Sequence, residues 1–137
     1  MGKSDKTVQF GYHMTLDFYG CPLQQLTDLK LCYKVLDELP AVLKMKKLTV
    51  PQVILADGNA EEGGKDPGGI TGFIVIAESH ISLHTFARRG FRSLDIYSCK
   101  EFSYEQAEKY LVNIFQPKDR EIYTLDRGTR YPTENIY

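Results

Sequence analysis

The stretch "ITGFIVIAESHISLHTF", residues 70–86, decides how this chain is built. Its first half is a continuous apolar run, which predicts a strand buried in a sheet. Polar residues interrupt the run, and a second strand segment is predicted over 81–86. The late connections of the chain are hairpin-like, so an antiparallel sheet is expected.

The flanking segments show the two periodicities of secondary structure. Residues 8–18 alternate strictly between apolar and other residues, which predicts a half-buried strand. Apolar residues recur every three or four positions over 26–43, which predicts a helix that Pro40 kinks or ends. A second helix, opened by a capping box, is expected over 103–115, and further strands at 48–55, 92–99 and 121–126. The expected fold is α+β, a two-layer sandwich in which an antiparallel sheet has helices packed on one face.

Composition and charge limit the kind of protein this is. The 137 residues have a formal net charge of −1 and are 42% hydrophobic, which is ordinary for a single soluble domain spanning 1–137. The near-neutral charge gives no case for nucleic acid or a membrane surface, and no apolar run approaches the roughly 18 residues that span a bilayer. The start of the chain lacks an apolar signal segment, so we expect a cytoplasmic protein. Its three cysteines have no CxxC spacing, which argues against a disulfide framework or a zinc site.

Glu78, Ser79, His80 and His84 are an unusual set for a strand that has just entered the core. On a straight strand His80 and His84 share one face and Ser79 lies on the other, so Ser79 and His84 meet only if the chain bends near 78–80. A bend predicts a strained Glu78–Ser79 peptide bond close to a base. Four interpretations are open: a solvated edge strand, a metal site at the two histidines, a Ser–His hydrolase, or self-cleavage in which Ser79 attacks the preceding carbonyl.

Three motifs resemble those of the prokaryotic S-adenosylmethionine decarboxylases, and the resemblance covers most of the chain. They are "TGFIVIAESHISLHT" (71–85), "LDIYSC" (94–99) and, in the first strand, "GYHMTLDFYGC" (11–21). The resemblance implies a proenzyme that cuts itself between Glu78 and Ser79 into a β chain, 1–78, and an α chain, 79–137. It also implies that Ser79 becomes a pyruvoyl group, which forms a Schiff base with the substrate amine and accepts the electrons left when CO2 departs. No metal and no pyridoxal phosphate is expected.

The resemblance also gives roles to individual residues. Thr71 stands where the family has a small hydroxyl residue that assists processing, and its hydroxyl is expected to bind the developing oxyanion. His84 would remove the Cα proton of Ser79 as a general base, and Cys99 would return a proton to the substrate carbon as the general acid. His13 receives no role. Because the family builds its active site at a protomer interface, we expect a homodimer of αβ units that acts on a small amino-acid substrate.

Two departures from the family concern the substrate. The family's glutamate that holds the ribose hydroxyls is replaced by Arg88, which has hydrogen-bond donors only and would repel a sulfonium. An ungapped alignment places Lys65 where the family has a phenylalanine that stacks on adenine. Phe86 is a candidate replacement, whereas Phe73 is expected in the core. Ile81, the family's other apolar contact to adenine, is retained.

The altered loop over 57–69 offers carboxylates to a basic substrate. Glu61, Glu62 and Asp66 are candidate partners for a cationic tail, and Arg88 is a candidate for binding a substrate carboxylate. These changes favour arginine or ornithine as the substrate, with S-adenosylmethionine as the alternative, and either product feeds polyamine synthesis. A catalytically silent member that binds a metabolite or a partner subunit is a further alternative.

Overall fold

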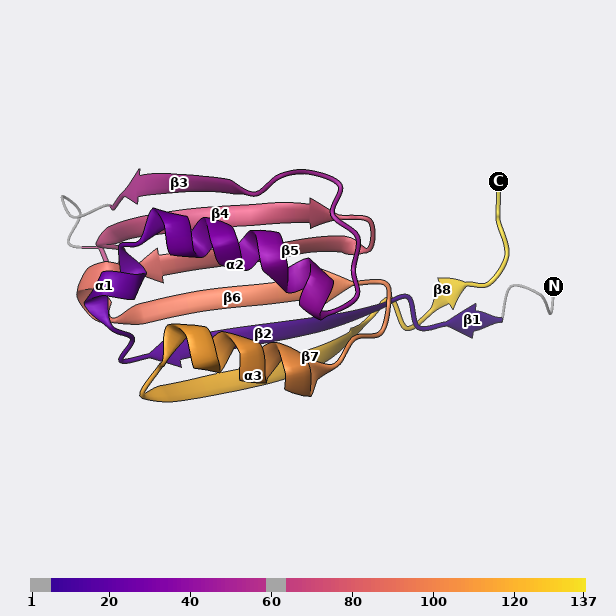
Figure 1. The fold of residues 1–137 in the computed structure, drawn as a ribbon. Coiled ribbons are helices and arrows are strands. Elements are labelled where there is room, and N and C mark those ends of the chain that lie inside the picture. Colours follow the sequence, from indigo (N-terminus) through magenta and orange to yellow (C-terminus); the bar gives the residue numbers. More distant parts are fainter. Residues whose placement is uncertain (1–5, 59–63) are drawn as a thin grey trace.

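A computed structural model describes residues 6–58 and 64–137 and shows a fold of two layers (Figure 1). One layer is a six-stranded sheet in the order β3-β4-β5-β6-β2-β7, with every neighbouring pair antiparallel. The second layer consists of helices on one face of this sheet. The expected α+β sandwich is therefore confirmed. The strands are β2 (Gly11–Tyr19), β3 (Gln52–Asp57), β4 (Gly68–Ile76), β5 (Ser79–Phe86), β6 (Phe91–Ser98) and β7 (Asp119–Arg127), and the helices are α1 (Leu23–Leu26), α2 (Leu29–Val42) and α3 (Tyr104–Phe115).

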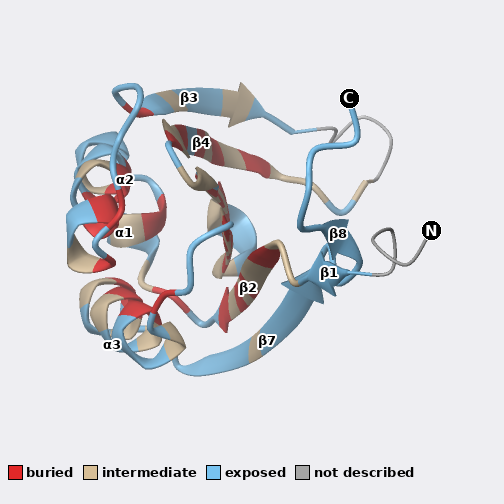
Figure 2. Cartoon of the chain, turned by 90° about the vertical axis from the view of Figure 1, so that its right-hand side faces the viewer, coloured by how far each residue is buried: buried red, intermediate tan, exposed pale blue. Residues whose placement is uncertain are grey.

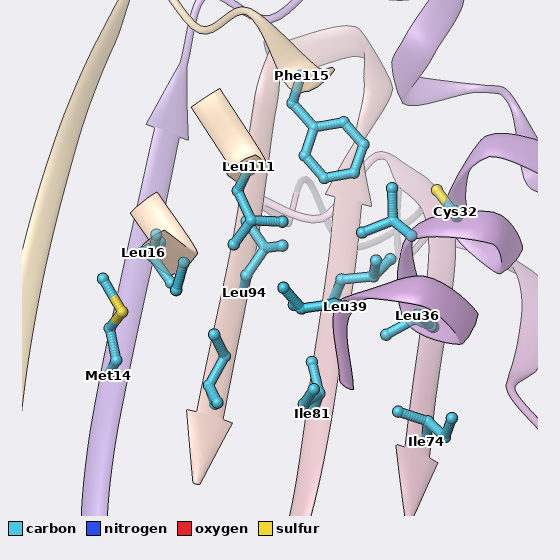
Figure 3. Packing of buried hydrophobic residues seen from close by; sticks show 14 of the residues in the cluster. Met14, Leu16, Cys32, Leu36, Leu39, Ile74, Ile81, Leu94, Leu111 and Phe115 are labelled. Atoms are coloured by element: carbon cyan, nitrogen blue, oxygen red, sulfur yellow. The ribbon is translucent and has the colours of Figure 1, made fainter. Parts of the chain in front are cut away.

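The core lies between the sheet and the helices. Leu36 and Leu39 of α2 and Leu111 of α3 point toward the sheet, where they join Ile74 and Ile81 in one apolar cluster (Figure 3). All five side chains are fully buried. Burying one side chain of this size stabilises the fold by about 1.5–3 kcal/mol, so this layer is the main source of folding free energy. Within the described ranges, no helix is long and apolar enough to cross a membrane.

The element boundaries differ from the prediction at several places. The helix predicted over 26–43 is divided, because the Asp28 carboxylate accepts the Leu31 N–H at 3.0 Å and starts α2 as a separate helix. Pro40 lies within the last turn of α2 and does not end it. The strand predicted at 48–55 begins only after Pro51, and β3 is an edge strand, as a proline there indicates. A short 3-10 helix, η3 (Ala87–Arg89), is absent from the prediction.

The second face of the sheet is not covered by a helix in the part of the chain that the structure describes, and we call it the open face. Figure 2 shows it on the side away from α2 and α3. Alternate residues of each strand form it, and many are only partly covered. Phe73 is one of them, with 42% of its surface exposed, so the prediction that it belongs to the core is wrong. Its position in β4 places it opposite to the buried face that carries Ile74.

A two-stranded ribbon extends from one end of the sheet. It pairs β1 (Thr7–Val8) with β8 (Tyr131–Pro132), so the predicted polar tail contains a strand. Figures 1 and 2 show the ribbon and the residues after it projecting beyond the strand ends, on the side of the open face. We call residues 6–8 and 129–137 the arm.

Arg92 is fully buried on the helix side of β6, although arginine usually lies at the surface. Its guanidinium carbon lies 3.5 Å from the centre of the Phe115 ring. The guanidinium donates to the Gln25 carbonyl oxygen at 3.0 Å and lies 3.5 Å from the Cys32 sulfur. Burial lowers the pKa of Arg92 and raises the pKa of Cys32. Through these contacts Arg92 of β6 holds α1 and α2 against one end of the sheet.

Candidate active site

Ser79 lies in the tight hairpin between β4 and β5. Ile76 pairs directly with Ser79, so only Ala77 and Glu78 form the turn. Ser79 has a φ of +154°, a conformation that residues with a side chain rarely adopt. The chain therefore has the bend that the sequence analysis left open, and the backbone is strained next to the predicted cleavage bond.

Glu78 is held from two directions. The Cys99 N–H donates a hydrogen bond to the Glu78 carbonyl oxygen at 2.9 Å, and the Lys46 N–H donates to the Glu78 carboxylate at 3.1 Å. The cysteine side chain itself is exposed. The structure thus brings Cys99 to the predicted cleavage bond, with a backbone donor aimed at the carbonyl oxygen on which negative charge would develop.

Thr71 and His84 form a second group. They pair across β4 and β5, with His84 Nδ1 3.3 Å from Thr71 Oγ1. His84 is five residues from Ser79 along β5, which corresponds to about 16 Å. His84 therefore does not lie beside the strained Glu78–Ser79 bond of its own chain. Thr71 likewise does not reach the Glu78 carbonyl of its own chain. The Cys99 N–H occupies the position that we expected the Thr71 hydroxyl to fill.

A polar cluster that the sequence analysis missed lies between the two groups on the open face. The Asp95 carboxylate accepts the Ser82 hydroxyl at 2.8 Å and lies 3.5 Å from His13 Nε2 and 3.8 Å from His80 Nε2. Arg127 Nη1 lies 2.8 Å from His13 Nδ1. Because a guanidinium only donates, His13 Nδ1 must accept, which leaves Nε2 free to carry a proton toward Asp95. Strand alternation places these residues on one face, but only the register between strands shows that they meet.

A pocket of about 580 Å³ opens at the Thr71–His84 end of the sheet. Three aromatic residues line it: the Phe91 ring lies 5.2 Å from Tyr19 and 5.6 Å from Phe86, centre to centre. Phe86 is two residues beyond His84 on the same face of β5. The other lining residues are Lys65, Asp66 and Arg89. We call this cavity the aromatic pocket, and its volume is in the range that holds a small-molecule ligand.

The predicted substrate contacts are distributed unevenly around this pocket. Asp66 lines it, although its carboxylate also accepts the Gly68 N–H at 2.9 Å. Arg88 is exposed and is not among the lining residues, whereas its neighbour Arg89 is. Ile81 is fully buried beneath the helices, so the expectation that it contacts a substrate is wrong. Glu61 and Glu62 lie outside the described residues.

The metal interpretation has no support in the described part of the chain. Within residues 6–58 and 64–137, no three His, Cys, Asp or Glu side chains gather as metal ligands. His80 and His84 are four residues apart on an extended strand, about 13 Å, which is too far for both to bind one ion.

Comparisons with known proteins bear on this arrangement. The family model described as S-adenosylmethionine decarboxylase matches residues 12–128. The chain belongs to this family. A relative from Pyrobaculum aerophilum, named S-adenosylmethionine decarboxylase proenzyme, is 31% identical over 122 residues, which cover 88% of this chain and 90% of the relative. A second with the same name, from Archaeoglobus fulgidus, is 31% identical over 119 residues, covering 86% of this chain and 97% of the relative.

A solved structure has the same fold. The crystal structure of the adenosylmethionine decarboxylase from Aquifex aeolicus superposes with a TM-score of 0.73 at 22% identity, over 93% of this chain and 98% of that one. The predicted family and the predicted class of enzyme, a decarboxylase, are confirmed by these matches.

Proposed function

We propose that the chain is a self-processing, pyruvoyl-dependent S-adenosylmethionine decarboxylase whose active sites are each shared by two copies. One observation carries the proposal: the predicted catalytic residues divide into two groups near opposite ends of β5. Ser79 and Cys99 form one group, and Thr71 and His84 form the other. Since one chain holds the groups about 16 Å apart, a complete site needs the other group from a second copy.

The open face is where the second copy fits. Two sheets packed face to face lie about 10 Å apart, so side chains from both reach into the space between them. A two-fold axis that lies between the sheets and crosses the strands reverses the strand direction in the second copy. The Ser79 end of one β5 then lies over the His84 end of the other, and two identical sites result.

The cleavage starts at a bond that the fold already strains. The Ser79 hydroxyl attacks the carbonyl carbon of Glu78, its proton passes to the amide nitrogen, and an ester replaces the peptide bond. The Cys99 N–H stabilises the charge on the carbonyl oxygen, and Thr71 of the second copy supplies a second donor. His84 of the second copy removes the Cα proton of Ser79, and elimination of the Glu78 carboxylate separates the chains. Addition of water to the remaining dehydroalanine releases ammonia and leaves the pyruvoyl group.

The surroundings of Ser79 suit that group. A pyruvoyl group supplies an electron sink for decarboxylation. At the start of β5 it would adjoin Cys99, whose side chain is exposed and free to return a proton to the substrate carbon. After cleavage the pairing of β5 with β6, in which residue 79 lies opposite Ser98, keeps the two groups in register.

The aromatic pocket favours S-adenosylmethionine over arginine or ornithine. Its three rings offer stacking surface to a planar purine. Lys65 and Arg89 put two positive charges against the single negative charge of Asp66, which would repel a cationic side chain but not neutral adenine. The names of the relatives point to the same substrate. The preference for arginine or ornithine, inferred from Lys65 and Arg88, gains no support from either source.

Intact-mass spectrometry tests the self-processing. Two fragments are expected, one ending at Glu78 and one beginning with a pyruvoyl group in place of Ser79. The Ser79→Ala variant should stay whole. A whole wild-type chain after prolonged incubation would refute the proposal and leave a silent member.

Co-expression of two inactive variants tests the shared site. A mixed dimer of Ser79→Ala and His84→Ala copies contains one complete site, built from Ser79 of one copy and His84 of the other. The His84→Ala copies should therefore be cut in the mixture, although neither variant is cut alone. Absence of cutting in purified mixed dimers would show that the residues act within one chain.

Trapping with cyanoborohydride identifies the substrate. The processed protein is incubated separately with S-adenosylmethionine, arginine and ornithine, and the mass of the pyruvoyl chain is measured. An adduct with S-adenosylmethionine is expected. Adducts with arginine or ornithine alone would reverse the substrate assignment while leaving the self-processing intact.

A further inference from the structure

The arm lies outside the part of the chain that the family model matches, residues 12–128. A two-stranded ribbon is at best marginally stable alone, and the arm exposes apolar side chains: Val8 is 50% exposed, Tyr131 49% and Ile136 71%. Packing against a partner surface would remove these side chains from water.

The base of the arm is fixed against the open face. The Phe10 ring lies 4.8 Å from Tyr131 and 6.4 Å from Tyr97, centre to centre. The Phe10 N–H donates to the Gly128 carbonyl oxygen at 3.0 Å, and Gly128 turns the chain with a φ of +59°. Tyr97 is two residues before Cys99, so the arm leaves the sheet at the end that holds Ser79. Figure 2 shows it directed away from the helix layer.

We propose that the arm reaches across to a second copy of this chain and closes that copy's aromatic pocket. The inference rests on the shared site proposed above. The two-fold axis that superposes the Ser79 end of one copy on the His84 end of the other also brings each arm to the partner's His84 end, where the aromatic pocket opens. The axis leaves the order of the strands unchanged, so the arm beside β2 and β7 arrives beside Tyr19 and Phe91 of the second copy.

The two surfaces are complementary. The arm presents Tyr131, Ile136 and Tyr137, and three aromatic rings line the pocket. Lys65 and Arg89 are exposed at the pocket, and the arm brings the exposed carboxylate of Glu134. Covering the pocket excludes water from the bound end of the substrate, which strengthens its contacts there.

Photo-crosslinking between differently tagged copies tests the proposal. One copy carries p-benzoylphenylalanine in place of Tyr137 and a polyhistidine tag, and the co-expressed copy carries a second tag. Irradiation should give a product that contains both tags, with the link mapped to residues 64–66 or 86–91 of the second copy. The same reagent in place of Leu29, which is 41% exposed on α2, should give no such product. Links confined to one chain, or links to the helix layer of the second copy, would overturn the proposal.

Removal of residues 133–137 gives a second measurement. The KM for S-adenosylmethionine should rise about tenfold, with self-cleavage and kcat unchanged, because the reacting residues lie elsewhere. An unchanged KM would refute the closure of the pocket. Self-cleavage, followed in the same samples, reports separately on the proposed function, and the crosslink needs no activity.

Discussion

Replacing Ser79 by glycine should stabilise the uncleaved chain relative to replacing it by alanine. Both variants lack the hydroxyl and stay uncut, so they differ only in the Cβ atom. At a φ of +154° a residue with a Cβ costs about 1–3 kcal/mol, and glycine adds about 0.5–1 kcal/mol of unfolded-chain entropy in the opposite direction. We therefore expect the free energy of unfolding of Ser79→Gly to be about 1 kcal/mol larger than that of Ser79→Ala.

Thermal unfolding followed by circular dichroism, at one protein concentration, measures this difference. For 137 residues, 1 kcal/mol corresponds to about 3–4 °C in Tm. Ser82 provides the control, because it lies on the same strand without a positive φ. There the glycine variant should be the less stable of the pair. If Ser79→Gly also melts below Ser79→Ala, the backbone at the cleavage point is not strained and the argument from strain fails.

Three further predictions concern catalysis, substrate binding and charge. Cys99→Ala should change the rate of self-cleavage by no more than a few-fold, because the backbone N–H remains. It should lower the rate of decarboxylation, measured as release of labelled CO2, about 100-fold or more. Loss of cleavage would contradict the role given to the N–H. Phe91→Leu should raise the KM for S-adenosylmethionine about 3–10-fold without changing kcat; an unchanged KM would remove the aromatic pocket from the substrate site. Burial and the facing Glu121 raise the pKa of Asp17. The folded state therefore binds the Asp17 proton more tightly than the unfolded state does. Stability is lost as the pH rises from 3.8, the unfolded pKa, through the raised pKa of the folded state. Asp17→Asn should therefore gain about 0.2–1 kcal/mol at pH 7 and nothing at pH 3 in urea unfolding; an equal gain at both pH values would show that charge is not the cause.

The fold class could be predicted because local periodicity is strong where one face of an element is buried. The alternation along β2 and the spacing of leucines in α2 both record which side meets the core. The order of the strands could not be predicted, since β2 pairs with β6 and β7, which come much later in the chain. Arg92 was also beyond sequence reasoning, because its burial depends on Phe115 and on the carbonyl of Gln25.

Sequence analysis named residues for the candidate site but could not give their geometry. Period-two alternation placed Ser79 and His84 on opposite faces of a straight strand, and the bend that it left open is present at Ser79. The expectation that a bend brings His84 close to the Glu78–Ser79 bond is wrong within one chain, because β5 runs on from Ser79 to His84 as one strand. The aromatic pocket depends on cross-strand contacts among Tyr19, Phe91 and Phe86, which come from three different strands. Sequence analysis identified only Phe86 among them.

The strand order has a consequence for the protein after the proposed cleavage. The segment before Ser79 contributes β2, and the segment after it contributes β6 and β7, which flank β2 on both sides. Once cut, the two pieces are interleaved and cannot part without melting the sheet. Unfolding, however, then yields two separate molecules, whose reassembly depends on their concentration, whereas the uncut precursor refolds its sheet as one chain. Each molecule would thus fold as a single chain only once, before it is cut. Enzyme unfolded by heat would be replaced by new synthesis more readily than refolded.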